Sequence, residues 1–501
     1  MTVDFDRHGL DYTRAICCAI ERYTESEVRR NSQAFMHRGM QLRYAVERWL
    51  YIHCINSQVL FTHYINRAND APTDALPELS TVESDIAFFL CQQRATDDHP
   101  PRWMGRWLLE MARRMYRVLR RPRSHAWPVR SPVQGCDILI HVVNAKFANY
   151  LVPVTGELEM GSYTYLVTSD VGLGEQLAKR GHPVVSVPTE SSLHQSVFCS
   201  YALSEFDQLM HAADATLAAL RVLQPRCTVV VEGNAPMDVI TAEASRLLEI
   251  PCYCVQQGWS PYVHNGFRNM RYSEMFVWGE RFAELLRPYN PRQVFRVTGS
   301  HALNTADAPP PRASIFTLSF FLQAPCALLG VQAYEDFVDL IADVAHAYPS
   351  VRVIVREHPG YPLPKASLEK VQGCSNVHFS IPADQQLAEV ISASDLVVSV
   401  FSTVLLEAMA LNVVPLICSI GAMRHYEPGI AAAGAAIEVH SVAAARCAVD
   451  QLIAEPARLA DIRKSMSKIT EEFFCSENGA KVIAARLSGA NMMRRAGRAL
   501  R

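Results

Sequence analysis

Three polar groups, each placed directly after a short apolar run, are the residues of this sequence best suited to chemistry. They are Glu232 after the run 228–231, His358 after the run 352–355, and Ser402 with Thr403 after the run 396–400. Short apolar runs are typical of buried parallel strands, and polar side chains at the carboxyl ends of such strands face one crevice. The sequence therefore predicts a ligand site built from these side chains.

The pair Ser402 and Thr403 has the properties of a phosphate site. A helical pattern of small and apolar residues follows it. Both hydroxyls therefore lie at a predicted helix N-terminus, where free N–H groups and the helix dipole favour an anion. Arg356 and His358, at a neighbouring strand end, complete a predicted pocket for a nucleotide phosphate, and Glu407 could accept a hydrogen bond from a ribose hydroxyl. Taken singly, each of these residues could equally be a helix cap or a turn residue.

Glu232 is the candidate for acid–base chemistry. A carboxylate at this place could act as a general base, or as a nucleophile toward an anomeric carbon. The alternative is a loop carboxylate that only holds local N–H groups. Asp238 is a second acid, assigned to sugar or acceptor binding, although it falls in the first turn of the predicted helix 237–248, where an acid is favoured anyway.

Further polar residues follow two other predicted strands. They are Asn144 and Lys146 after 138–143, and Gln257 and His264 after 251–255. Asn144 and Lys146 could donate to a sugar carboxylate or a phosphate, and Gln257 could bind the same sugar or its acceptor. The loop of His264 also carries aromatic rings on which a sugar or a base can stack. A single histidine is more often structural than catalytic, so both roles stay open for His264.

Composition limits the class of protein. The chain has 501 residues, 49% hydrophobic and 20% charged, with a net charge of −2. These values suit a globular protein of two or three domains and give no basic field for nucleic acid. The 14 cysteines form no CxxC pair and no zinc-type Cys/His cluster, which predicts free thiols in a reducing cytoplasm. No apolar run is long enough to span a bilayer, and no signal-peptide pattern is seen.

The order of predicted elements indicates an α/β protein with four parts. Residues 1–130 have helical periodicity, 131–305 and 306–475 each alternate strands with helices, and 476–501 form a C-terminal helix. Such alternation implies parallel strands with right-handed crossovers, hence two doubly wound Rossmann-type domains facing a cleft. The basic residues within 113–123 and 492–501 are most simply solvated or frayed segments, with contact to a membrane surface as the alternative.

These residues also carry a resemblance. The order Glu232–Gly233, His358–Pro359 and Ser402–Thr403 resembles the acidic-Gly, HP and S-S/T motifs of bacterial sialyltransferases and related capsule enzymes. The strand and helix contexts are similar to those of GT-B transferases that use CMP-sugars, which include Kdo transferases, and of teichoic-acid glycerophosphotransferases. The resemblance covers about residues 136–475, and each motif is only two or three residues long.

The resemblance implies a GT-B glycosyltransferase that moves an acidic keto-sugar, of the Kdo or sialic acid type, from a CMP donor to a glycan acceptor. The product would belong to capsule, lipopolysaccharide or another surface polysaccharide. By this resemblance Glu232 is the catalytic carboxylate and His358 stabilises the departing CMP phosphate, which Ser402 and Thr403 hold. No cofactor or metal is expected, and the expected location is the cytoplasm, with peripheral contact at the inner membrane face as an option. Val231 stands where a second acid is usual, which leaves inversion and retention both open.

Other functions are open on the same fold. They are a UDP-sugar glycosyltransferase, a UDP-N-acetylhexosamine 2-epimerase, a CDP-glycerol glycerophosphotransferase and a non-catalytic glycan-binding protein. Glu407 is compatible with UDP binding. Nucleotide preference separates these alternatives, because a nucleotide that binds the folded state raises its stability by mass action.

Overall fold

The structure is a computed structural model of the chain. It describes residues 16–25, 28–29, 32, 35–55, 136–168, 171–187, 201–259, 267–303, 308, 310, 312, 314–323, 329, 331–358, 361–382, 384–400, 402–420 and 428–499. His264, the basic run 113–123 and most of the predicted helical region 1–130 lie outside these residues.

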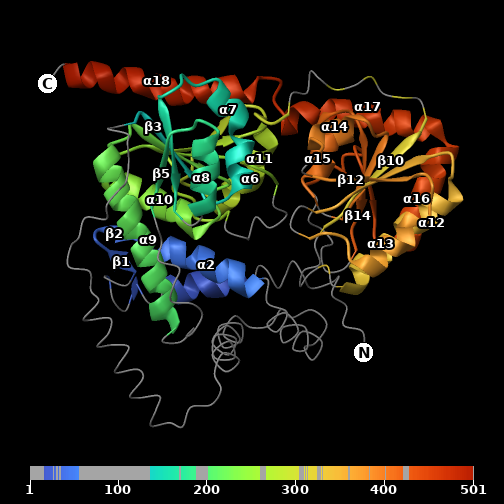
Figure 1. The fold of residues 1–501 in the computed structure, drawn as a ribbon, viewed down its shortest axis with the longest axis horizontal. Helices are drawn as coiled ribbons and strands as arrows, with labels where there is room; N and C mark the ends of the chain where they lie inside the picture. The colour runs from blue at the N-terminus through green and yellow to red at the C-terminus, as the bar shows by residue number, and fades with distance from the viewer. Residues whose placement is uncertain are drawn as a thin grey trace, which may run out of the picture.

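The first domain is built on a seven-stranded parallel sheet in the order β5-β4-β3-β6-β7-β8-β9 (Figure 1). The strands are β3 (Ile138–Val142), β4 (Tyr163–Val167), β5 (Val184–Ser186), β6 (Cys227–Val231), β7 (Cys252–Val255), β8 (Glu274–Val277) and β9 (Phe295–Val297). Every residue of β3, β4, β6, β7 and β8 is buried. Helices cover both faces of such a sheet, which is why these strands are continuous apolar runs rather than alternating ones.

Different helices cover the two faces of this sheet. Leu139 packs with α9 (Tyr201–Leu223) and α10 (Pro236–Leu247). Its neighbours Ile138 and Ile140 point to the other face, since successive strand side chains alternate. That face packs against α6 (Ala145–Tyr150), α7 (Val152–Gly156) and α8 (Val171–Lys179). The domain also contains α11 (Glu280–Leu286) and the 3-10 turn η1 (Arg287–Tyr289).

The described part of the N-terminal region packs against the first domain. It consists of helical residues 16–25, the antiparallel ribbon of β1 (Met36–His37) and β2 (Met40–Gln41), and α2 (Arg43–Ile55). Its apolar side chains share one core with α9 and α10. Glu21 also accepts hydrogen bonds from Arg268 Nε (2.8 Å) and Asn269 Nδ2 (3.0 Å). These segments are therefore an extension of the first domain's core rather than a separate helical unit.

The second domain is built on a six-stranded parallel sheet in the order β12-β11-β10-β13-β14-β15. The strands are β10 (Thr317–Phe321), β11 (Arg352–Arg356), β12 (Val377–Ser380), β13 (Leu396–Ser399), β14 (Val414–Cys418) and β15 (Ile437–Val439). The helices are α12 (Val331–Ala347), α13 (Lys365–Gln372), α14 (Leu387–Ser392), α15 (Val404–Ala410), α16 (Val442–Ala454) and α17 (Pro456–Phe473). Parallel pairing throughout confirms the doubly wound class for both domains.

The chain crosses back to the first domain after α17 and ends in α18 (Gly479–Ala499), which lies along the first domain (Figure 1). At the crossing, Cys475 N–H donates to the Trp278 carbonyl (2.9 Å). Gly299 has a φ of 78°, and a Cβ there would lie 2.3 Å from the Glu477 carbonyl, so only glycine fits. Arg486 Nε of α18 donates to Glu274 on β8 (3.2 Å), which fastens this helix to the first domain.

Each sheet has one point at which the order of its strands reverses. The candidate site lies at these two points. The non-consecutive neighbours are β3 with β6 in the first sheet and β10 with β13 in the second. In open α/β sheets ligands bind beyond the carboxyl ends of the strands at such switch points. Asn144 and Glu232 follow β3 and β6, and Ser402 follows β13, so the polar residues predicted from sequence lie at both switch points.

Candidate functional site

The loop after β3 places a cap and a cation at the first switch point. Asn144 has extended backbone angles and its Oδ1 accepts a hydrogen bond from the Phe147 N–H (2.9 Å), so its side chain starts α6. Lys146 lies in the first turn of that helix and is exposed. The cation is therefore held on a short capped helix, whereas the Asn144 carbonyl oxygen is already engaged.

Glu232 stands in a strained backbone conformation directly after β6. Its φ is 68°, in the left-handed region, which costs a side-chain-bearing residue about 1–2 kcal/mol. The backbone is held there because Glu232 N–H donates to the Val255 carbonyl (2.8 Å) and Gly233 N–H donates to that of Val231 (2.8 Å). Such outliers persist where the surrounding structure over-determines them, and they cluster at functional sites. This geometry supports Glu232 as the first candidate for a reacting group.

Lys146 brings three ionisable groups from two domains into one electrostatic cluster. Burial raises the pKa of Glu232, and the Lys146 ammonium opposes that rise. Burial lowers the pKa of His358, and Lys146 lowers it further. Burial also raises the pKa of Glu407, and Lys146 opposes that rise. These three side chains therefore lie within electrostatic range of one cation, although they come from elements of both domains.

Glu407 is the buried acid of this cluster. Its side chain lies in α15, is 9% exposed, and burial raises its pKa to about 7 against the opposing influence of Lys146. Its Oε2 is buried and has no hydrogen-bond partner among the described residues. A buried carboxyl oxygen without a partner is costly, so it is expected to hold either a proton or a hydrogen bond from a ligand.

Thr403 joins the two domains directly. Its Oγ1 accepts a hydrogen bond from the Trp259 N–H (3.0 Å) and donates to the Trp259 carbonyl (3.1 Å). Gly258 lies so close that a Cβ would be 2.9 Å from the same oxygen. Ser402 differs, because its Oγ accepts from the Val404 N–H (3.3 Å) within its own turn. Both hydroxyls are thus engaged within the protein, and their predicted phosphate role stays a prediction.

We expect Thr403→Val to favour separation of the two domains. The substitution keeps the shape but removes both hydrogen bonds to Trp259, worth about 1–3 kcal/mol together. Small-angle X-ray scattering of the ligand-free protein should then give a larger radius of gyration. Ser402→Ala is the matched control, because it removes only a local hydroxyl. An unchanged radius for Thr403→Val would show that this contact does not hold the domains together.

Sequence reasoning missed Tyr150, which contacts Gln256, a polar residue at the end of a predicted strand. Tyr150 lies one helical turn after Lys146, and its hydroxyl donates to the Gln256 carbonyl (3.3 Å). Burial raises the pKa of Tyr150, and the nearby acids Glu407 and Glu232 raise it further. Gln256 is buried and its Oε1 accepts from the Trp278 N–H (3.0 Å). The spacing of Lys146 and Tyr150, four residues apart on one helix face, is the signal that could have found Tyr150.

Three predicted residues are engaged elsewhere or lie at the margin. The Arg356 guanidinium donates to Ser380 Oγ (2.7 Å) and to the Gln385 carbonyl (3.0 Å), so it ties β11 to β12. Asp238 is 1% exposed and its Oδ2 accepts from the Ala235 N–H (3.2 Å), which is the helix-start role that its position allowed. Gln257 is half-buried in the loop after β7. The binding roles predicted for these residues stay predictions.

Among the described residues, no group of three or more His, Cys, Asp or Glu side chains is arranged to bind a metal ion. Within the same residues, no helix is both long and apolar enough to cross a bilayer.

Comparison with solved structures identifies the architecture. The UDP-GlcNAc 2-epimerase from Neisseria meningitidis, bound to UDP-GlcNAc, matches with a TM-score of 0.51 and 17% identity, over 70% of this chain and 100% of its own. The protein has the GT-B fold. The S. aureus protein MnaA in complex with UDP also matches, with a TM-score of 0.51 and 13% identity, over 71% of this chain and 97% of its own.

A third GT-B structure agrees. It is a putative UDP-N-acetylglucosamine 2-epimerase from Listeria monocytogenes, with a TM-score of 0.50 and 15% identity, over 71% of this chain and 96% of its own. No protein-family model and no curated protein matches the sequence. At such low identity the likeness establishes the GT-B fold and leaves the activity to be argued from the site.

Proposed function

We propose that this GT-B protein is an enzyme that uses a UDP-sugar and breaks the bond between the anomeric carbon and the diphosphate. The observation that carries the proposal is the cluster of Lys146, Glu232, His358 and Glu407, which two domains contribute to one place. The GT-B neighbours that contain UDP or UDP-GlcNAc add support for the nucleotide. Activity, donor and product are proposals.

Each member of the cluster has a role that its surroundings suit. Departure of UDP leaves negative charge on the diphosphate, and Lys146 with His358 supplies cation and donor to stabilise it. Burial raises the pKa of Glu232, and a carboxylate with a raised pKa is a stronger base toward a substrate proton. Glu407 holds an unpartnered carboxyl oxygen, to which a ribose hydroxyl can donate.

Two reactions share this bond cleavage. In glycosyl transfer, Glu232 takes the proton of an acceptor hydroxyl that attacks the anomeric carbon. In 2-epimerisation of a UDP-N-acetylhexosamine, the base removes the proton at C2 as the C1–O bond to UDP breaks, which leaves a C1–C2 double bond. UDP then adds back to C1 while C2 takes a proton on its opposite face. Incubation with UDP-GlcNAc alone distinguishes them, because only an epimerase forms the 2-epimer without an acceptor.

A CMP-sugar transferase is the second candidate function. The order Glu232–Gly233, His358 and Ser402–Thr403 favours it, because the resemblance rests on that order. Lys146 influences the pKa of both Glu232 and His358, which supports a site that would suit either donor. The nucleotide therefore has to be decided by binding.

We expect UDP to stabilise the protein and CMP to do so much less. A ligand at about 100 times its Kd stabilises the folded state by about 2.7 kcal/mol, which a thermal-shift screen with CMP, CDP, UMP, UDP and GDP detects. In Glu407→Gln the UDP shift should shrink, because an amide replaces the ribose acceptor. Glu335→Gln, an exposed change on α12, is the control. A shift with CMP and none with UDP would overturn the proposal in favour of the CMP-sugar transferase.

A further inference from the structure

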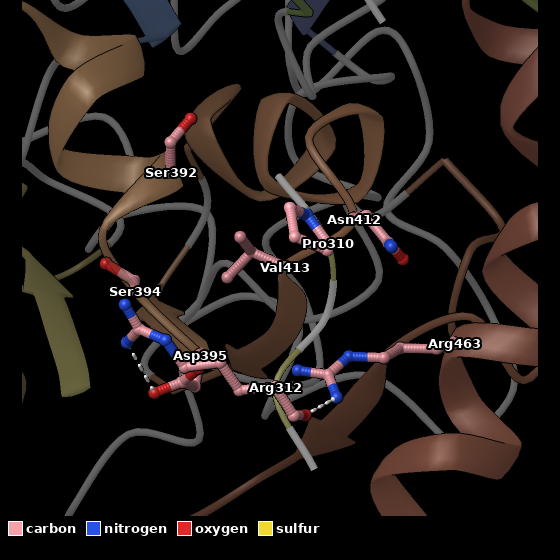
Figure 2. A pocket seen from close by; sticks show the side chains of 8 residues that line it. All are labelled: Pro310, Arg312, Ser392, Ser394, Asp395, Asn412, Val413 and Arg463. Atoms are coloured by element: carbon pink, nitrogen blue, oxygen red, sulfur yellow. Dashed lines mark hydrogen bonds and ion pairs between the residues drawn. The ribbon is translucent and has the colours of Figure 1, made fainter. Parts of the chain in front are cut away.

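A cavity of about 340 Å³ opens in the second domain, and the candidate site does not use it (Figure 2). Its walls include Pro310, Arg312, Ser394, Asp395, Asn412 and Arg463. Figure 2 shows Arg463 reaching the backbone of Arg312, whose own guanidinium reaches Asp395. Four separate stretches of the chain therefore meet around this space.

The cavity lies at the amino ends of the strands, whereas the candidate site lies at their carboxyl ends. Asp395 immediately precedes β13 and Asn412 lies shortly before β14, so both stand at the amino ends of their strands. Ser402 follows the carboxyl end of β13, which is about 13 Å long. The two places share no residue and face opposite ways, so the cavity is a separate site.

The charge exposed to this cavity is positive. Asp395 is buried, and its Oδ2 accepts from the Phe316 and Thr317 N–H groups (2.9 Å each) and lies 3.4 Å from Arg312 Nη1. The charge of the Asp395 carboxylate is therefore compensated by these two N–H groups and the Arg312 guanidinium. Its partner Arg312 has a half-exposed side chain, with further N–H groups directed to solvent.

Arg463 lines the cavity, and the hydrogen bonds of its guanidinium are only partly satisfied. Its Nη1 donates to the Arg312 carbonyl, whereas its Nε is buried and has no hydrogen-bond partner among the described residues. Burial lowers the pKa of Arg463, and Asp395 only opposes this. A guanidinium that is partly desolvated and incompletely compensated gains from a nearby anion.

We propose that this cavity binds a small phosphomonoester of the size of a hexose phosphate. Two guanidinium groups provide the planar forks that suit phosphate oxygens. The volume of about 340 Å³ lies at the small end of the range for ligand pockets and exceeds what a bare phosphate fills. Pro310 and Val413 offer apolar surface for a sugar ring, and the Asn412 amide offers a donor and an acceptor for hydroxyls.

The position of the cavity also suggests what binding would do. Pro310 and Arg312 belong to the segment between β9 and β10, which joins the two domains, whereas Arg463 lies on α17 of the second domain. A phosphate held by both arginines would fasten the joining segment to that domain. The inference does not depend on the reaction proposed for the interdomain site.

Isothermal titration calorimetry on the full chain tests the proposal, with glucose 6-phosphate as probe and UDP present throughout to occupy the interdomain site. We expect glucose 6-phosphate to bind, glucose not to bind, and inorganic phosphate to bind more weakly. Arg463→Gln should weaken binding about tenfold or more, as loss of a charge-assisted hydrogen bond predicts. Arg352→Gln, an exposed arginine at the same sheet edge outside the cavity, should leave it unchanged.

A second variant is needed in case Arg463→Gln loses binding only because it fails to fold. Arg312→Gln changes a half-exposed side chain and should also weaken binding about tenfold, with a circular dichroism spectrum like that of the original protein. Absence of glucose 6-phosphate binding, or binding by both arginine variants as tight as that of the original protein, would overturn the proposal. Equal affinity for inorganic phosphate would overturn its sugar part.

Discussion

Glu232→Gln is expected to lower kcat by about 10²–10⁴-fold while leaving the fold intact, because the amide keeps the shape of the side chain but cannot exchange a proton. The site predicts this result, since Glu232 stands at the switch point of the first sheet and burial raises its pKa while Lys146 opposes the rise. The measurement is turnover of UDP-GlcNAc, monitored as release of UDP or as formation of the 2-epimer. Near-normal turnover in this variant would remove Glu232 from the chemistry.

A matched control is available in the same domain. Glu249 is also a glutamate with left-handed backbone, with a φ of 56°, but it is exposed. Glu249→Gln should therefore keep full activity. Glycine adopts this conformation without strain, so Glu232→Gly should be inactive and yet more stable than the original by about 1 kcal/mol. Loss of stability in that variant would mean that Glu232 has a structural role instead.

The sheet strands could be predicted because they are buried on both faces. Runs such as 396–400 and 228–231 are therefore mostly apolar, and charged side chains appear where the strand ends. Glu232, His358 and Ser402 were found in this way. The two doubly wound domains followed from alternation of strands and helices, since parallel strands need helical crossovers, whereas the GT-B class was implied by the motif resemblance.

Contacts between distant segments could not be predicted. Arg356 looks like a phosphate ligand in sequence, but the register pairs it with Ser380 on β12, where its guanidinium is engaged. Thr403 looks like a phosphate ligand too, and its use against Trp259 depends on how two domains meet. The role of Lys146 as the cation shared by both domains has the same origin. Such contacts have no local signature in the residues that make them.

Glu407→Gln is expected to change how stability depends on pH. The pKa of Glu407 is raised from 4.5 to about 7 in the folded protein, so the folded state binds the proton more tightly than the unfolded state. Between these two pH values the folded state holds more protons, and stability must fall as pH rises. The loss is about 3 kcal/mol at most, and the glutamine variant should lack it.

The measurement is urea denaturation of both proteins at several pH values between about 4.5 and 8. Asp238, whose pKa burial raises to about 8, adds a slope of the same sign, so the difference between the two proteins is the informative quantity. Glu335→Gln controls for the loss of an exposed glutamate. Equal slopes in the original and Glu407→Gln would show that this carboxyl titrates normally.

Saturating UDP connects this behaviour to function. A ribose hydroxyl that donates to Glu407 stabilises the ionised carboxylate and lowers its pKa. Much of the pH slope should then disappear in the UDP complex of the original protein, whereas UDP should change the slope of Glu407→Gln much less. If UDP binds and the slope of the original protein is unchanged, the nucleotide does not contact Glu407. The unpartnered carboxyl oxygen would then need another explanation, because a buried acid of this kind is retained at a cost of about 1–3 kcal/mol.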